Sequence, residues 1–439
     1  MKNADKACIL FSIAGAVFFA AVYFVYGMWG HTVIACMYRG ESLGILNSVI
    51  QGQKELPVDF YFGIADSRFT FFFFNSVVLG IVLMAMSWAT VRWGILPVLI
   101  WALLGAAISE SLIWSVLAKP VVLNYLPVPI RDLILEIYFY YDRRTIQYEP
   151  ASALYDPELG YTLKPGAFTF ACREFNNQFR VNRLGLRDDD FSLEAPDVII
   201  LGDSVAMGWG VDQDQTFAEI LQQKSHLKVL NTAVSSYGTA REMRLLDRLD
   251  TSRLKYLIVQ YHPNDFRENE EFYIKGNRWP GADPVRYAER QRAYLTAHSY
   301  YPGKYTVKLA GMLKRDLLLR WYDRPRSVEP FPVSHAPDPV TEVKMFLNAL
   351  IHGSHVDLSR VRVIVIEISP HLFIDDQFVS TLRMHLEKED VSRYFLDLRV
   401  MDLSPVLKDE KYFYLLDDHL NVLGHETVAK VLLQAMQSS

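Results

Sequence analysis

Four short stretches of the sequence carry side chains that can perform nucleophilic chemistry. The run from Asp197 to Gly210, DVIILGDSVAMGWG, begins as an apolar strand-like segment and stops abruptly at Gly-Asp-Ser. Further along the chain come NTAVSSYGT, YHPNDF and LLDDHLNVLGH, of which the first two follow apolar runs and the third precedes an amphipathic segment. Acyl transfer needs a nucleophile, a base and hydrogen-bond donors for an oxyanion. Serine, histidine and asparagine in these stretches can supply all three.

A parallel β-sheet is predicted to bring these stretches together. Short apolar runs alternate with segments whose apolar residues recur at helical spacing, which predicts an α/β sheet covered by helices on both faces. Ligands of such three-layer folds bind at the carboxyl ends of the strands. The polar stretches follow those ends. The predicted strands are 198–201, 228–230, 256–260 and 362–368, with a weaker one at 394–398.

From about residue 150 to residue 439 the chain resembles the SGNH (GDSL-type) hydrolase family. The blocks of that family are a GDS serine, a glycine after the second strand, an asparagine in GxND, and DxxH near the C-terminus. Gly202-Asp203-Ser204 matches the first block, Asn264-Asp265 matches the third, and RVNRLGLRDDD is similar to the lead-in of bacterial members. The resemblance implies an SGNH hydrolase-like, flavodoxin-like α/β/α fold, which needs no cofactor.

The resemblance also implies roles for individual residues. Ser204 is the expected nucleophile, and its backbone N–H is an expected oxyanion donor. His419 would accept the serine proton and return it to the leaving group. Asn264 would point its side-chain N–H at the oxyanion. Supporting roles in the turn, the loop and the histidine segment are expected for Gly202, Asp203, Asp265 and Asp418.

Two positions depart from the family pattern. Ser236 stands where a glycine is usual, although its backbone N–H remains a candidate oxyanion donor. The residue three before His419 is Leu416, so the carboxylate that orients the imidazole must be Asp417 or Asp418. Asp417 is favoured because adjacent side chains in an extended segment point apart. A Ser-His dyad with a carbonyl orienting the ring is the alternative.

Each candidate also has a purely structural interpretation. Ser204 could cap a helix in an ordinary turn, and His419 could be a surface histidine. His425, after Gly424 at a helix start, is expected to be structural, whereas His262 could line the pocket or fix its loop. No two cysteines recur at ligand spacing, and no metal site is expected.

The first part of the chain has the composition of a membrane region. Residues 7–29 give 23 positions without a charge, which at about 1.5 Å per residue can cross a hydrocarbon core of about 30 Å. Two further apolar runs, 69–91 and 95–118, predict a hairpin of spanning helices. Residues 1–120 are therefore expected to hold three transmembrane helices, with Glu110 serving helix packing or the interface.

The rest of the chain divides into a connector and a catalytic domain. Residues 121–147 mix prolines with an apolar stretch and are predicted to connect the two parts, along the membrane surface or as a plain helix. Residues 148–439 have the composition of a soluble domain. Residues 267–337, rich in Tyr, Arg and Trp, are expected to form a helical insertion in it.

These features predict a membrane-anchored serine esterase or O-acyltransferase that forms an acyl-enzyme. Its expected substrate is an ester-bearing cell-envelope glycan or lipid, and its expected partner is a membrane protein that supplies acyl groups. The alternative is a catalytically inactive SGNH-like binding or scaffold module. The net charge of −5 argues against a nucleic-acid binder. By family habit the protein would be a multi-pass protein of the cytoplasmic membrane with its catalytic domain on the extracytoplasmic side.

Overall fold

The computed structural model describes residues 13, 17, 85–86, 88–279, 281–322, 338–368, 377–388 and 390–437. The chain divides into two compact units. The first consists of residues 1–114 and 301–335, and the second of residues 115–300 and 336–439. The predicted spans at 7–29 and 69–91 lie almost entirely outside the described residues. The third predicted span is described in full.

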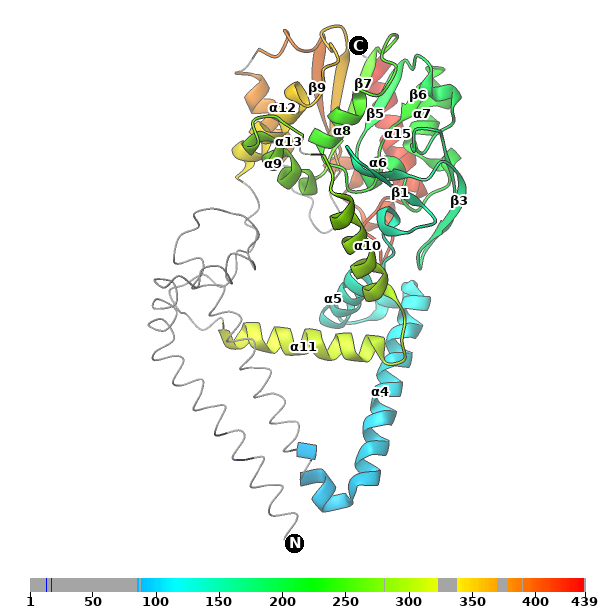
Figure 1. The fold of residues 1–439 in the computed structure, drawn as a ribbon, viewed down its shortest axis with the longest axis vertical. Helices are drawn as coiled ribbons and strands as arrows, with labels where there is room; N and C mark the ends of the chain where they lie inside the picture. Colours follow the sequence, from blue (N-terminus) through cyan, green and yellow to red (C-terminus); the bar gives the residue numbers. More distant parts are fainter. Residues whose placement is uncertain are drawn as a thin grey trace. The chain divides into compact units, whose positions relative to one another are not determined.

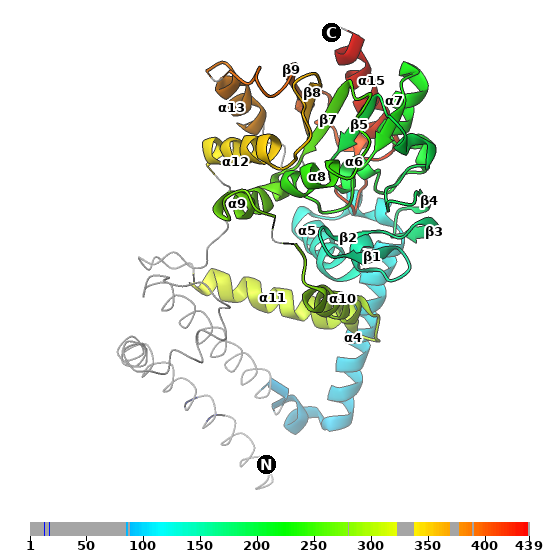
Figure 2. The same cartoon turned by 45° about the horizontal axis from the view of Figure 1, so that its top comes forward.

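A five-stranded parallel sheet forms the centre of the second unit (Figures 1 and 2). The strand order is β6-β5-β7-β8-β9. This confirms the predicted α/β class, and the four stronger strand predictions coincide with strands to within one residue. The strands are β5 (Val198–Leu201), β6 (Val229–Asn231), β7 (Tyr256–Tyr261), β8 (Arg362–Glu367) and β9 (Asp397–Asp402).

The weakest strand prediction was displaced along the chain. Strand β9 begins at Asp397, whereas the apolar run that suggested a strand begins at Tyr394. Phe395 is instead buried in the core from the turn before the strand. The strand lies at the edge of the sheet and is only half-buried, so its sequence is more polar than that of the central strands.

Helices cover both faces of the sheet, as Figure 1 shows, and the side chains of β5 are buried on both faces. Val198 and Ile200 of β5 pack into one core, and Ile199 and Leu201 pack into the other, because successive strand side chains point to opposite faces. The three-layer prediction is thus confirmed. The first core includes α7 (Phe217–Ser225) and α15 (Val422–Gln437), and the second includes α8 (Thr239–Leu246), α12 (Pro339–His352) and α13 (Gln377–Leu386).

Two antiparallel hairpins that the sequence does not predict precede the sheet. In β4 inward and outward side chains alternate strictly, but only Phe179 and Val181 among the inward ones are apolar. The hydrophobic pattern is therefore too weak to predict the strand. The hairpins are β1 (Ala153–Asp156) with β2 (Gly160–Leu163), and β3 (Gly166–Ala171) with β4 (Asn176–Val181).

The connector between the third apolar run and the hairpins is a chain of short helices. Ile134, Ile137 and Tyr138 are buried, whereas Phe139 and Tyr140 are exposed. One side of this segment is therefore buried, and Ile146 at its end belongs to a core that packs on the sheet. Its elements are η1 (Pro120–Tyr125), α5 (Val128–Ile137), η2 (Tyr138–Asp142) and η3 (Ile146–Tyr148).

Helices also occupy the described part of the expected insertion. α9 (Phe266–Ile274) and α10 (Pro284–His298) belong to the second unit and α11 (Lys304–Tyr322) to the first, while residues 323–337 lie outside the described part. Short helices complete the chain: α6 (Ser204–Met207), α14 (Ser404–Leu407), and the 3-10 turns Phe191–Leu193, Gln213–Gln215, Pro263–Asp265 and Glu410–Tyr412.

In the first unit, α4 (Ile95–Ala118) is the one described helix whose length and composition suffice to cross a membrane. Its polar exception, Glu110, accepts the backbone N–H of Thr306 at 2.9 Å and the hydroxyl of Thr306 at 3.1 Å. Ser109 lies 2.8 Å from the same hydroxyl. Glu110 therefore holds the start of α11 against α4, as a helix-packing role requires.

Candidate active site

The strand β5 ends at Gly-Asp-Ser, where the chain turns into the short helix α6. A Cβ on Gly202 would lie 2.6 Å from the Cβ of Ala206 and 2.7 Å from Gln260 Oε1, so only glycine fits there. Asp203 caps α6 by accepting the backbone N–H of Val205 at 2.9 Å. Ser204 is therefore the first residue of a helix at the carboxyl end of a central strand.

Ser204, His419 and Asp417 form a continuous hydrogen-bonded series. The imidazole Nε2 of His419 lies 2.7 Å from Ser204 Oγ, and its Nδ1 lies 2.5 Å from Asp417 Oδ1. Ser204 is 8% exposed and His419 is 4% exposed. The imidazole stacks on the indole of Trp209, with ring centroids 4.9 Å apart. The structure thus brings the three predicted catalytic residues together in the order that nucleophilic catalysis requires.

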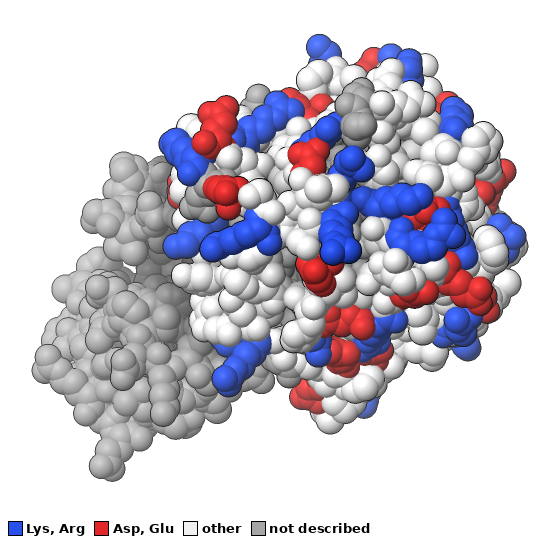
Figure 3. All heavy atoms as spheres, turned by 90° about the horizontal axis from the view of Figure 1, so that it is seen from above, with Lys and Arg blue, Asp and Glu red and all other residues white. Residues whose placement is uncertain are grey.

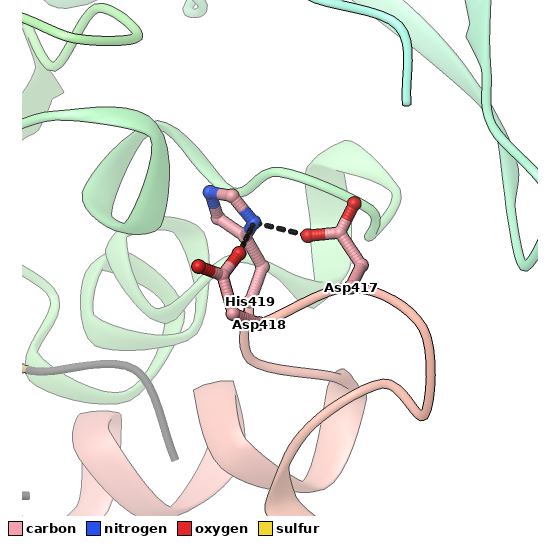
Figure 4. A group of neighbouring side chains, drawn as sticks. All are labelled: Asp417, Asp418 and His419. Carbon is pink, nitrogen blue, oxygen red and sulfur yellow. Dashed lines mark hydrogen bonds and ion pairs between the residues drawn. The ribbon is translucent and has the colours of Figure 1, made fainter. Parts of the chain in front are cut away.

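Two carboxylates, and not one, lie beside the imidazole (Figure 4). Asp418 Oδ1 is 3.2 Å from the same Nδ1 that Asp417 contacts. The side chain of Asp417 is fully buried, whereas that of Asp418 is 33% exposed. The second oxygen of Asp417 accepts hydrogen bonds from the Tyr138 hydroxyl at 3.0 Å and from Trp209 Nε1 at 3.2 Å.

The expectation that Asp417 and Asp418 point apart fails because their segment is not extended. Glu174, in the β3–β4 turn, accepts the backbone N–H groups of Leu415, Leu416 and Asp417 at 2.9, 2.8 and 3.0 Å. Three successive donors that converge on one carboxylate curl the chain. The curl brings both aspartates to the ring.

The charges around His419 make it a strong base. Burial alone would lower the pKa of the imidazole, but Asp417 and Asp418 outweigh burial and raise this pKa to about 9. Burial also raises the pKa of Asp417, yet Arg143 and the imidazole outweigh it and hold the pKa below its usual range. Arg143 and His419 likewise keep the pKa of Asp418 low against the effect of burial.

Asn264 lies next to the nucleophile turn. Its side-chain Nδ2 is 3.4 Å from Asp203 Oδ2, and its residue is exposed at the carboxyl end of β7. The backbone N–H of Asn264 donates to Nδ1 of His262 at 3.1 Å. His262 was expected either to line the pocket or to fix its loop, and this contact is of the loop-fixing kind.

Ser236 has a backbone conformation that favours glycine. Its φ is 59°, in the left-handed region, which a side chain makes costly by about 1 kcal/mol. This strain accounts for the glycine of the family pattern. The Ser236 hydroxyl accepts a hydrogen bond from Gln147 Nε2 at 3.0 Å, so the side chain is held by the connector segment.

Asp265 braces its loop from a buried position, as expected. Its Oδ2 accepts the hydroxyl of Thr239, the first residue of α8, at 3.0 Å. Burial, reinforced by the charge of Asp203, raises the pKa of Asp265, and burial raises that of the neighbouring Glu242 as well. Both carboxyls are therefore harder to ionise than exposed ones.

Asp417, Asp418 and His419 also have the atoms of a metal-ligand group, since one ligand atom from each lies within 4.8 Å of the others. The guanidinium of Arg143 stands beside them, 3.0 Å from Asp418 and 3.8 Å from Asp417. It supplies the positive charge that a cation would bring. The arrangement is therefore that of an acid–base group.

Four residues that hold this site were not predicted from the sequence. Tyr138, Trp209 and Arg143 contact the aspartates, and Arg187 donates to the carbonyls of Met207, Gly208 and Val211 at the end of α6. Only Arg187 carried a usable signal, because it lies in the lead-in RVNRLGLRDDD. Tyr138 and Arg143 lie in the predicted connector, and Trp209 lies five residues after Ser204 in a stretch where only the Gly-Asp-Ser turn was assigned a role.

No protein-family model and no curated protein sequence matches the chain. Among solved structures, TesA is 11% identical over 55% of this chain and 98% of its own, with a TM-score of 0.28. The lipase Lip_vut3 from a goat rumen metagenome is 14% identical over 54% of this chain and 96% of its own, with a TM-score of 0.29. The salicylyl-acyltransferase SsfX3 from a tetracycline biosynthetic pathway is 12% identical over 56% of this chain and 55% of its own, with a TM-score of 0.27.

Scores this low do not say what the chain does, so its function is inferred from its own side chains. The serine, asparagine and histidine of the SGNH pattern stand at one edge of a three-layer parallel sheet. This arrangement agrees with the resemblance found in the sequence.

Proposed function

We propose that this chain is a serine esterase or O-acyltransferase that works through an acyl-enzyme at Ser204. The observation that supports the proposal is the hydrogen-bonded series from Asp417 through His419 to the Ser204 hydroxyl, with distances of 2.5 and 2.7 Å. A serine hydroxyl is a weak nucleophile at neutral pH without such a base. All the groups that the reaction needs are side chains and backbone of this chain.

The reaction would proceed in two balanced steps. Ser204 Oγ attacks the ester carbonyl while its proton moves to His419 Nε2, and a tetrahedral intermediate forms. The intermediate collapses when the leaving alcohol takes the proton from the imidazolium, leaving an acyl-serine ester. Water or a sugar hydroxyl then attacks that ester and gives its proton to His419, forming a second tetrahedral intermediate. This intermediate collapses as the imidazolium returns the proton to Ser204 Oγ, and the product acid or new ester departs.

The oxyanion of each intermediate needs nearby donors. The backbone N–H of Ser204 lies at the start of α6, where the helix leaves N–H groups without partners. The side-chain amide of Asn264 is within reach of the same turn, because it contacts Asp203. With the backbone N–H of Ser236, these are the proposed oxyanion donors.

The membrane region suggests where the substrate would be found. One described helix, α4, has the length and composition of a span, and the connector follows it directly in the chain. A tethered esterase or transferase would meet esters of the cell envelope, so the proposed substrate is an acylated glycan or lipid on the extracytoplasmic side. A membrane protein would deliver acyl groups if transfer is the outcome.

Two assays on the full-length protein in detergent test this function. A fluorophosphonate probe should label the wild type covalently and should not label Ser204→Ala. The matched control Ser380→Ala, at an exposed serine on α13, should label like the wild type. Hydrolysis of short and long p-nitrophenyl esters, with and without an acetylated glycan, should then separate acyl length and acceptor.

A non-catalytic glycan-binding or scaffold module is the second candidate. Ser236 in a glycine position and the altered block before His419 favour it, because both are departures from the catalytic pattern. An unlabelled wild type with the thermal stability of a folded domain would favour this module over the enzyme.

A further inference from the structure

The segment between α4 and the catalytic sheet supplies a side chain to the catalytic base. Arg143, one residue beyond η2, is only 16% exposed on its side chain. Its Nη1 donates to Asp418 Oδ1 at 3.0 Å, and its Nε lies 3.8 Å from Asp417 Oδ2. The guanidinium also lies over the rings of Phe139 and Trp209, at 4.8 and 5.4 Å from their centroids.

One oxygen of Asp418 is shared between two cations. Asp418 Oδ1 is 3.0 Å from Arg143 and 3.2 Å from His419 Nδ1, so the guanidinium competes with the imidazole for the same atom. Asp417 commits its Oδ1 to the imidazole, and its Oδ2 accepts from Tyr138 and Trp209. Arg143 is therefore placed to form an ion pair with the second carboxylate, that of Asp418.

The charge balance gives this contact a consequence for catalysis. An ordinary triad places one carboxylate beside the imidazole. Here two carboxylates lie beside it. Two unopposed negative charges would stabilise the imidazolium so strongly that the ring would stay protonated and could not act as a base. With the guanidinium, the net charge beside the ring returns to −1, which is that of one carboxylate.

We propose that Arg143 is a positioning residue that neutralises Asp418 and so keeps the His419 imidazole available as the base for Ser204. This inference rests on the proposed function, because it concerns the same triad. It makes the segment 119–148, which joins α4 to the hairpins, part of the active site.

Other groups that face the site are included in this balance. The other titratable neighbours of the aspartates and the ring are six residues: Tyr138, Cys172, Glu174, Tyr414, His425, and His262 directly after β7. Burial raises the pKa of the Tyr138 hydroxyl far above its usual value and that of the Cys172 thiol to about 12. These two groups stay neutral near pH 9. Burial raises the pKa of Tyr414 above its usual value and lowers that of His425 to about 3, so these groups are neutral as well. Glu174 and His262 are the same in every variant, so differences between variants come from Arg143 and Asp418.

The test is the pH dependence of fluorophosphonate labelling at Ser204 between pH 6 and pH 10.5, measured on the full-length protein in detergent. Arg143→Gln should move the half-maximal rate to higher pH by about one unit, which is about a tenfold loss of rate at pH 7. Asp418→Asn should move it to lower pH. The double variant should return close to the wild-type midpoint, because it restores a net charge of −1.

Controls separate charge from packing. Arg144→Gln, at the adjacent arginine that bonds Glu149 and not the site, should leave the midpoint unchanged. Arg143→Lys keeps the charge without the planar fork and should fall between Arg143→Gln and the wild type. Thermal unfolding of each variant reports folding. If Arg143→Gln fails to fold, the double variant and Arg143→Lys carry the comparison.

An unmoved midpoint in folded Arg143→Gln would overturn the inference. So would a double variant that stays at the midpoint of Arg143→Gln. If the wild type itself is not labelled, the proposed function fails, and NMR titration of isotope-labelled histidine tests the inference separately. The His419 signal should then titrate at higher pH in Arg143→Gln than in the wild type.

Discussion

At the scale of single residues, the two aspartates beside His419 have unequal environments. Asp417 is fully buried and accepts hydrogen bonds from Tyr138 and Trp209 in addition to its 2.5 Å contact with the imidazole. Asp418 is one-third exposed, lies 3.2 Å from the ring and is shared with Arg143. Asp417 therefore fixes the tautomer of the ring, whereas Asp418 chiefly adjusts its charge.

These environments predict different effects of the two isosteric substitutions. Asp417→Asn should lower kcat/KM for p-nitrophenyl acetate by about 10³- to 10⁴-fold, because the imidazole loses its correct tautomer. Asp418→Asn should lose less than about tenfold at pH 9. In the pH profile of kcat/KM, the pH of half-maximal activity should be lower for this variant than for the wild type. The reason is that removal of a carboxylate lowers the His419 pKa from about 9.

The measurement is the pH profile of kcat/KM for both variants alongside the wild type. The sign is that of a base that must be neutral to act, so wild-type activity rises as pH rises through the imidazole pKa. A larger loss in Asp418→Asn than in Asp417→Asn would reverse the assignment of the catalytic acid.

The chemistry-bearing residues were predictable where they occur in local patterns. Ser204, Asn264 and His419 each follow or precede a recognisable apolar run, and Asp417 lies two residues from its histidine. Arg143 lies 275 residues from Asp418 in the chain, and no local pattern marks that pairing. Only the folding of the connector onto the sheet creates it.

At the scale of elements, the helix that carries the nucleophile is too short to be stable alone. α6 has 4 residues, fewer than a free helix needs to repay its nucleation. Arg187 holds its C-terminal end by donating to the carbonyl oxygens of Met207, Gly208 and Val211. The lead-in that contains Arg187 thus positions Ser204 from the opposite end of the helix.

Removal of this anchor should destabilise the domain. Arg187→Met should lower the free energy of unfolding by more than about 2 kcal/mol, because buried carbonyl oxygens lose their donor. The matched control Arg183→Met, at an exposed arginine of the same loop, should change it by less than about 0.5 kcal/mol. Urea titration followed by tryptophan fluorescence measures both, and equal effects would contradict the anchoring role.

The elements themselves were predictable to different degrees. The central strands are continuous apolar runs buried on both faces, so their positions follow from composition. The strands of the two hairpins have 4 to 6 residues and no consistent polar–apolar alternation, so the pattern is too weak to distinguish them from loop. The site needs both, since the β3–β4 turn supplies Glu174.

At the scale of the whole molecule, charge is distributed without a dominant sign. On the face seen in Figure 3, basic and acidic side chains are interleaved over the described residues. Together with the net charge of −5, this gives no extended basic surface on that face for a polyanion. The features that bear on location are therefore the apolar helix α4 and the charges that flank the apolar runs.

Those flanking charges do not decide which side of the membrane holds the active site. With the N-terminus inside, the cytoplasmic segments would carry Lys2, Lys6 and Arg92. The other side would carry Arg39, Lys54, Arg68 and Lys119, so the positive-inside rule slightly opposes this orientation. The proposed chemistry favours it nevertheless, because three spans from an inside N-terminus would place Ser204 where envelope esters would be exposed.

A reporter that is active only outside the cytoplasm, fused after Ser439, should therefore be active in the full-length protein. The matched control inserts the same reporter after Gly94, between the second and third predicted spans, and should be inactive because this hairpin would face the cytoplasm. An inactive C-terminal fusion of a stably expressed protein, with an active insertion after Gly94, would place the catalytic domain inside. The proposed envelope substrate would then be excluded, while the triad chemistry would stand on a cytoplasmic ester.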